Sequence, residues 1–204
     1  MSRSSGTTGR LPVKREVGLD TDRAADTFPL TLDSLRVLGS WAADCAARAL
    51  PVFAKYAHSD SRPYAAIEGI RVFAAGGKRT AQLRTLAMQA HAAAREVGVP
   101  AAEAAARAAG LAAASAYTHP LRDVHQTKHI VGPAAYAALA LELDHAGDPH
   151  IGDAEVRWAI AHAPAAVSEL LQQMPVRQAG KSRLDQLLYE LDAGVRGRDW
   201  PQDG

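Results

Sequence analysis

Residues 101–114 restrict the fold of this chain more than any other segment, because ten of their fourteen positions are alanine. Alanine has the highest helix propensity, and its methyl group buries little apolar area. A core made of such residues requires helices whose backbones approach closely. Aromatic residues make up only 5% of the chain. We therefore predict an all-α fold, a single-domain bundle of about eight alanine-rich helices.

The composition is that of a globular protein. The chain has 204 residues, of which 48% are hydrophobic and 22% are charged. One domain is the usual outcome at this length. We expect a mobile N-terminal leader at residues 1–29, a helical domain at 30–194 and a C-terminal tail at 195–204, because both ends are polar and lack helical periodicity.

The balance of charges excludes some classes of partner. Lys and Arg total 23 against 22 Asp and Glu, and no basic stripe of the kind that binds nucleic acid occurs.

The sequence has neither an apolar signal core nor a run of about 18 apolar residues, so we expect no membrane span. The single cysteine, Cys45, fits a reducing compartment. These features favour a cytoplasmic protein.

Helix boundaries can be placed at proline, glycine and capping residues. Pro51 predicts either a kink or a restart, and Pro133 predicts either a bend or a break between two short helices. The predicted N-terminal caps are Thr31, Ser61, Thr80, Asp153 and Ser182.

Two histidines within the segment 119–136 are the strongest candidates for chemistry. His125 and His129 are four residues apart, which places them on one face of a helix. Such a pair suits a shared proton, an anion or a metal, but it is equally typical of an ordinary solvated face. A zinc site would need a third protein ligand, which could come from Glu68, Asp44 or His91.

We predict a pocket between the helices in which scattered polar groups meet. Each of these groups also has an ordinary explanation, as a surface ion pair or a satisfied boundary residue. The predicted polar lining is Asp44, Arg62, Glu68, His91, His125 and His129, with Trp41 and Tyr136 as aromatic walls.

The common catalytic signatures are missing from the sequence. It contains no phosphate-binding loop, no nucleophile elbow, no zinc-protease motif and no dinucleotide fingerprint. Cys45 lies within an apolar helical face, where a thiol normally serves packing. No catalytic residue is assigned.

Several segments together resemble a bacterial family of immunity proteins of the toxin–immunity type, some members of which carry an exonuclease label. The resemblance extends over residues 31–175. It is carried by Leu32–Arg36, Trp41–Cys45, Arg62–Glu68, Ala90–Arg95, Ala104–Gly110, His125–Ala137 and Trp158–Pro164. It implies an all-α protein that neutralises a toxin. Residues 117–124 and the C-terminal leucine helix depart from the family pattern as an insertion and an extension.

Three hypotheses about function follow. The first is an immunity-type protein that binds a protein toxin or a small ligand stoichiometrically, with no cofactor. The second is a helical enzyme of a biosynthetic or resistance pathway that uses the His and carboxylate pocket, with a divalent metal at His125 and His129 as one version. The third is a homodimeric scaffold that associates through the leucine stripe at residues 184–191.

Overall fold

The computed structural model describes residues 27–197, in which nine α-helices confirm the predicted all-α fold. Most of the expected leader and the end of the tail, residues 1–26 and 198–204, lie outside the described residues. In the described part, the only strand-like contact is an isolated bridge between Thr27 and Leu121. The helices are α2 (Leu32–Ala47), α3 (Leu50–Tyr56), α4 (Arg62–Ala74), α5 (Ala81–Glu96), α6 (Pro100–Ala114), α7 (Val124–Asp144), α8 (Pro149–Ala161), α9 (Ala165–Gln172) and α10 (Arg183–Val195), with a 3₁₀ turn, η1 (Ser115–Tyr117), after α6.

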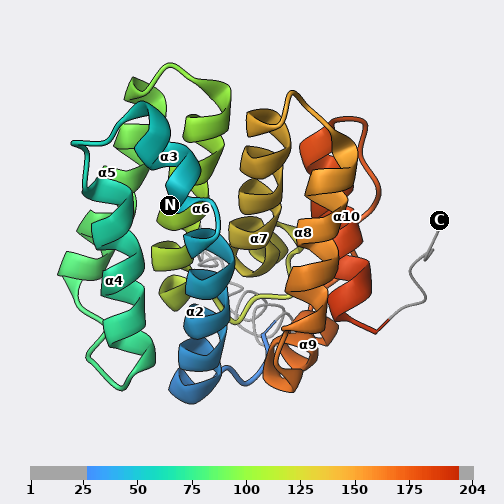
Figure 1. Cartoon of the computed structure of the whole chain (residues 1–204). Helices are drawn as coiled ribbons and strands as arrows, with labels where there is room; N and C mark the ends of the chain where they lie inside the picture. Colours follow the sequence, from blue (N-terminus) through green and yellow to red (C-terminus); the bar gives the residue numbers. More distant parts are fainter. Residues whose placement is uncertain (1–26, 198–204) are drawn as a thin grey trace, which may run out of the picture.

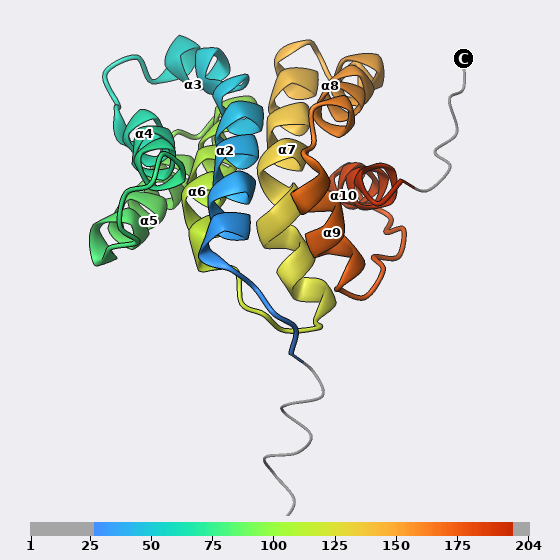
Figure 2. The ribbon, with the colours of Figure 1, turned by 90° about the horizontal axis from the view of Figure 1, so that it is seen from below.

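Helices α6 and α7 form the most extensive helix pair and lie at the centre of the bundle. Helix α2 packs against both of them and runs alongside them in Figure 1. Helices α4 and α5 cover one side, and α8, α9 and α10 cover the other (Figure 2). None of the helices in the described part combines the length and apolarity needed to cross a bilayer.

Several boundaries follow the sequence signals. The Thr31 hydroxyl accepts a hydrogen bond from the Ser34 amide at 3.0 Å, and Ser182 caps α10 in the same way. Pro51 marks a restart, because α2 ends at Ala47 and α3 begins at Leu50. Pro133 lies inside a single continuous helix, α7, so no break occurs there.

One predicted cap is wrong, and two predicted N-cap residues make no capping hydrogen bond. Asp148, not Asp153, caps α8 through a bond from the His150 amide. Pro149 follows Asp148 directly, and proline is favoured at the first helical position. Ser61 and Thr80 precede their helices, but neither side chain accepts a capping bond.

The core consists mainly of alanine, and the helices approach closely where glycine removes the last side-chain atom. A Cβ placed on Gly39 would lie 2.9 Å from the Ile70 side chain, where α2 meets α4. A Cβ on Gly110 would lie 2.8 Å from the imidazole of His91, where α5 meets α6. Gly110 therefore provides the space that the His91 ring occupies.

The leucine stripe of α10 belongs to the core. Leu187, Leu188 and Leu191 are buried, and Leu184 is half-buried against them. The stripe packs on the rest of the bundle and offers no apolar face to a second copy. The predicted dimer interface at residues 184–191 is therefore wrong.

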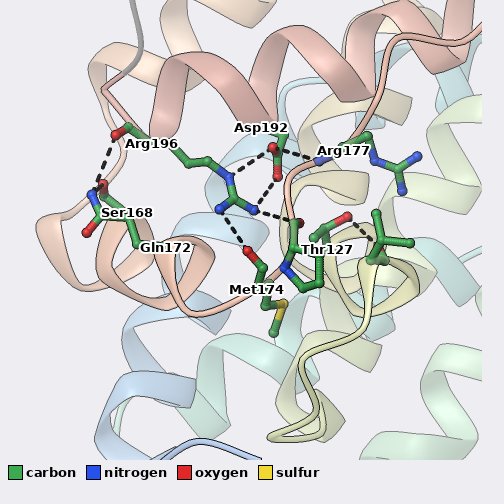
Figure 3. A network of polar contacts seen from close by, with 9 residues as sticks. Thr127, Ser168, Gln172, Met174, Arg177, Asp192 and Arg196 are labelled. Carbon is green, nitrogen blue, oxygen red and sulfur yellow. Dashed lines mark hydrogen bonds and ion pairs between the residues drawn. The ribbon is translucent and has the colours of Figure 1, made fainter. Parts of the chain in front are cut away.

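Buried ion pairs hold α10 in place. Arg183 binds Glu142 of α7 and Asp153 of α8, and the Glu142 side chain is only 7% exposed. Near the other end of α10, Arg196 pairs with Asp192, whose side chain is 1% exposed, and donates to the carbonyl oxygens of Met174 and Pro175 (Figure 3). The carboxylate of Asp192 also accepts a bond from the backbone amide of Arg177.

We expect Arg183→Met to lower the free energy of unfolding by about 3 kcal/mol, because it leaves the buried carboxylate of Glu142 without its counter-ion. Urea denaturation monitored by circular dichroism measures the change. The matched control is Arg157→Met on α8, since Arg157 is exposed and forms no ion pair with a described residue. Equal losses in the two variants would contradict the importance of the buried pair.

We expect Gly110→Ala to destabilise the protein by about 1–2 kcal/mol, because the clash of the new methyl with His91 outweighs the gain in helix propensity. In a His91→Ala background the same substitution should become neutral or stabilising, by up to about 1 kcal/mol. A double-mutant cycle from urea denaturation tests this change of sign. The same cost in both backgrounds would show that the imidazole is not what fills the space above Gly110.

Candidate functional site

A cleft of about 550 Å³ opens between α2, α4 and the C-terminal end of α8. Trp41, one of the residues that line it, links α2 to α8, because its Nε1 donates a hydrogen bond to the Ala159 carbonyl oxygen at 3.1 Å. The residues around the cleft are Val37, Ser40, Trp41, Asp44, Arg48, Arg71, Trp158, His162 and Pro164.

One wall of the cleft is a stack of rings. The imidazole of His162 lies on the indole of Trp158, with 4.2 Å between centroids and 20° between planes. Nδ1 of His162 is 2.7 Å from the Trp158 carbonyl oxygen. Because a carbonyl only accepts, Nδ1 carries the proton, which leaves Nε2 of a neutral ring as an acceptor. The wall thus offers both a flat apolar surface and a polar edge.

Charges of both signs surround the rings. The guanidinium of Arg48 lies 4.1 Å from the centroid of Trp158 and also makes two hydrogen bonds to Glu155. These bonds raise the pKa of Arg48 above its usual range. Arg71 donates to Glu68 at 2.9 Å and lies 3.8 Å from Asp44. The Arg71 pairs are largely exposed, so they contribute little stability and can exchange for other partners.

The structure places two of the eight predicted pocket residues in the lining of this cleft and a third next to a lining residue. Trp41 and Asp44 line it, and Glu68 lies at its edge through the shared partner Arg71. Arg62 lies elsewhere, where it pairs with Asp60 and Glu96 and ties the start of α4 to the end of α5.

A second group of predicted residues lies between α5, α6 and α7. His91 is half-buried against Gly110, and its electrostatic neighbours include Arg107, Lys128 and His129. Nδ1 of His129 is buried with no hydrogen-bond partner. Pro133, four residues later, has no N–H to donate to the His129 carbonyl.

Tyr136 and His125 complete the predicted set. The Tyr136 ring lies under the ammonium group of Lys128, 5.7 Å from its centroid. His125 is exposed in the first turn of α7, where its backbone amide donates to Asp123. The predicted residues are therefore divided among separate places and do not line one hollow.

The hypothesis of a metal bound by His125 and His129 gains no third ligand from the described residues. No group of three or more His, Cys, Asp or Glu side chains between residues 27 and 197 is close enough to hold a metal ion. His129 is half-buried among α5–α7 whereas His125 is exposed, so the pair does not share one environment.

Cys45, the neighbour of Asp44 in α2, is buried and only 2% exposed. Burial raises the pKa of its thiol far above the usual value, with a further contribution from Asp44. A thiol in such surroundings is not a nucleophile at neutral pH. This agrees with the packing role expected from the sequence.

Seven of the nine cleft residues were missing from the predicted set, among them Arg48, Arg71, Trp158 and His162. Trp158 and His162 are four apart on one helix, a spacing that could have identified them as a ring pair. Arg48 gave no such signal, because its contacts with Glu155 and Trp158 join different helices.

Over residues 29–166 the chain matches the family described as Imm-5 like putative immunity protein. The chain belongs to this family. All nine residues that line the cleft lie within the matched part of the Imm-5 like protein, whereas α10 lies beyond it. The family resemblance expected from the sequence is thereby confirmed. Searches of curated proteins and of solved structures found no match.

We expect the stability of this Imm-5 like protein to fall as the pH drops from about 7 to 5. Burial, followed by Arg107 for His91 and by His119 for His129, holds the pKa of each imidazole below its ordinary value. The unfolded chain therefore binds more protons than the folded one in this range. Below the pKa values that the two imidazoles have in the folded protein, both states are protonated, so these histidines cause no further loss of stability.

Urea midpoints of the wild type and of a His91→Gln, His129→Gln variant, measured across this pH range, test the assignment. The variant should lose less stability than the wild type over the same interval. A steeper loss of stability in the variant would show that the two histidines do not destabilise the folded protein as the pH falls.

Proposed function

We propose that this Imm-5 like protein neutralises a protein toxin by binding it one-to-one, and that the face containing the Trp41–Trp158 cleft is the binding surface. The observation that carries the proposal is the pairing of two tryptophans with a rim of exchangeable charges, all within the part that matches the immunity family. Its action in the cytoplasm stays a prediction from the sequence.

The aromatic part of the cleft supplies the chemistry of a binding hot spot. Hot spots are enriched in Trp, Tyr and Arg and lie in pockets that lose water on binding. Trp41 is rigid because it is buried and hydrogen-bonded, and Trp158 is only half-buried. A partner side chain inserted here would therefore gain a preorganised apolar wall.

The surface beside the cleft enlarges the area available to a protein partner. A stable interface needs about 800 Å² on each side, more than one cleft provides. Val72 follows Arg71 on α4 and is 64% exposed, and Tyr64, two turns earlier, is 40% exposed. These residues extend the surface along α4.

The charged rim gives a basis for orientation and association rate. Asp44, Glu68 and Arg71 are all largely exposed, with weak mutual pairs. A partner with complementary charges can replace those pairs at little cost, and such complementarity mainly accelerates association and excludes wrong partners.

The proposal is tested by co-expression with toxic proteins encoded beside the gene for this chain. The wild type should restore growth, and titration calorimetry with the toxin that it neutralises should give one-to-one binding. Trp158→Ala should weaken binding by about 2 kcal/mol or more. Asp44→Lys, an exposed change that leaves the core intact, should weaken it as well and slow association.

Met88→Ala is the matched control, since Met88 is exposed on α5 and α5 contributes no residue to the cleft. It should rescue growth and bind like the wild type. Rescue by the wild type with undiminished binding by both cleft variants would place the toxin on another face. Failure to neutralise any neighbouring toxin would remove the toxin-binding proposal.

A small ligand in the same cleft is the second candidate. The volume of about 550 Å³ lies within the range of small-molecule pockets, and the stacked rings suit a flat ligand. Such a ligand would raise the melting temperature of the wild type at saturation but not that of Trp158→Ala. The enzyme alternative lacks a comparable observation, because the His and carboxylate residues it requires lie in separate places.

A further inference from the structure

A second cavity, of about 490 Å³, lies between the start of α2, the start of α5 and the loop after η1. It shares no lining residue with the Trp41–Trp158 cleft. Its lining is divided into an apolar part, made by Leu30, Leu32, Leu35 and Pro120, and a polar part, made by Arg79, Arg84, Tyr117, Thr118 and His119.

The polar part carries positive charge, and no carboxylate is among the residues that line the cavity. The guanidiniums of Arg79 and Arg84 lie 5.7 and 4.6 Å from the centroid of the Tyr117 ring. No ion pair links either arginine to another residue of the described part of the chain, whereas Arg48 and Arg71 of the cleft are both paired with acids. Stacking on one ring thus holds two cations near each other without neutralising them.

Contacts on every side fix the shape of this cavity. The Tyr117 hydroxyl donates to the Thr80 carbonyl oxygen at 2.5 Å, and Arg79 donates to the Ala116 carbonyl oxygen at 3.0 Å. The Phe28 amide donates to the Pro120 carbonyl oxygen at 3.2 Å. Figure 2 shows this loop passing beside the start of the described chain, where Thr27 forms a bridge with Leu121.

We propose that this cavity binds a carboxylate that is attached to an apolar group. The carboxylate would lie between Arg79 and Arg84, whose planar guanidiniums match its two oxygens. The apolar group would cover the leucines, of which Leu32 is 44% exposed. A simple inorganic anion would pair with the two arginines only, and the leucines would stay in contact with water.

Such a group has two sources, a free monocarboxylic acid and the C-terminus of a peptide that ends in an apolar residue. The proposal rests on the geometry of this cavity and is independent of toxin binding at the cleft. The lining residues 117–120 belong to the segment 117–124, which is expected from the sequence to be an insertion.

The test uses octanoate, with octanamide as the neutral analogue of the same size, in titration calorimetry and thermal-shift assays on the full chain. Octanoate should bind and raise the melting temperature, and octanamide should bind about 10-fold more weakly or worse. Arg79→Gln and Arg84→Gln should each weaken octanoate binding by about 10- to 100-fold. Arg95→Gln, at the far end of α5 and outside the cavity, should bind like the wild type.

A leucine-terminated pentapeptide, with a free or an amidated C-terminus, distinguishes the sources. Tighter binding of the free peptide than of octanoate, lost on amidation, assigns the cavity to a peptide C-terminus. Tighter binding of octanoate assigns it to a free acid.

The proposal fails if neither carboxylate binds, if octanamide binds as well as octanoate, or if the two arginine variants bind like Arg95→Gln. Asp44→Lys in the cleft should leave octanoate binding unchanged. Because that variant should weaken toxin binding but not octanoate binding, it separates a failure of this proposal from a failure of the toxin proposal.

Discussion

Close approach of helix backbones is the constraint on which this structure depends. An alanine methyl buries little area, so the core gains its stability from many short contacts and from dense packing. Glycine extends the same principle at the crossings of α2 with α4 and of α5 with α6, where even one added carbon would lie within 3 Å of a side chain. The helices therefore have few alternative positions.

This type of core determines where large and polar side chains can lie. Closely packed helices leave no room for a polar cavity at the centre, so rings and charges gather where helices diverge at the edges. Trp41 shows the transition, because its indole is buried yet borders the cleft and bonds to α8. Both cavities lie at such edges, one beside α8 and one beneath the loop after η1.

The helices could be predicted from sequence because their signals are local. Alanine content, apolar spacing and residues such as Thr31 and Ser182 act within one turn. Pro133 was ambiguous, since proline permits either a bend or a break and packing decides between them. The site was harder to predict from the sequence. Trp41 and Asp44 share a helix, but Arg48 and its partner Glu155 are 107 positions apart in the chain. Only the packing of both α2 and α8 on α7 brings such residues together.

The ion pair between Arg183 and Glu142 has a consequence for the limits of the domain. Glu142 belongs to the part shared with the immunity family, and Arg183 belongs to the helix that follows it. A shortened protein ending at residue 166 would contain a carboxylate whose surroundings were shaped for a cation it no longer has. In this chain α10 therefore supports the part that matches the family, so a shortened version would have to replace Glu142 before it could omit α10.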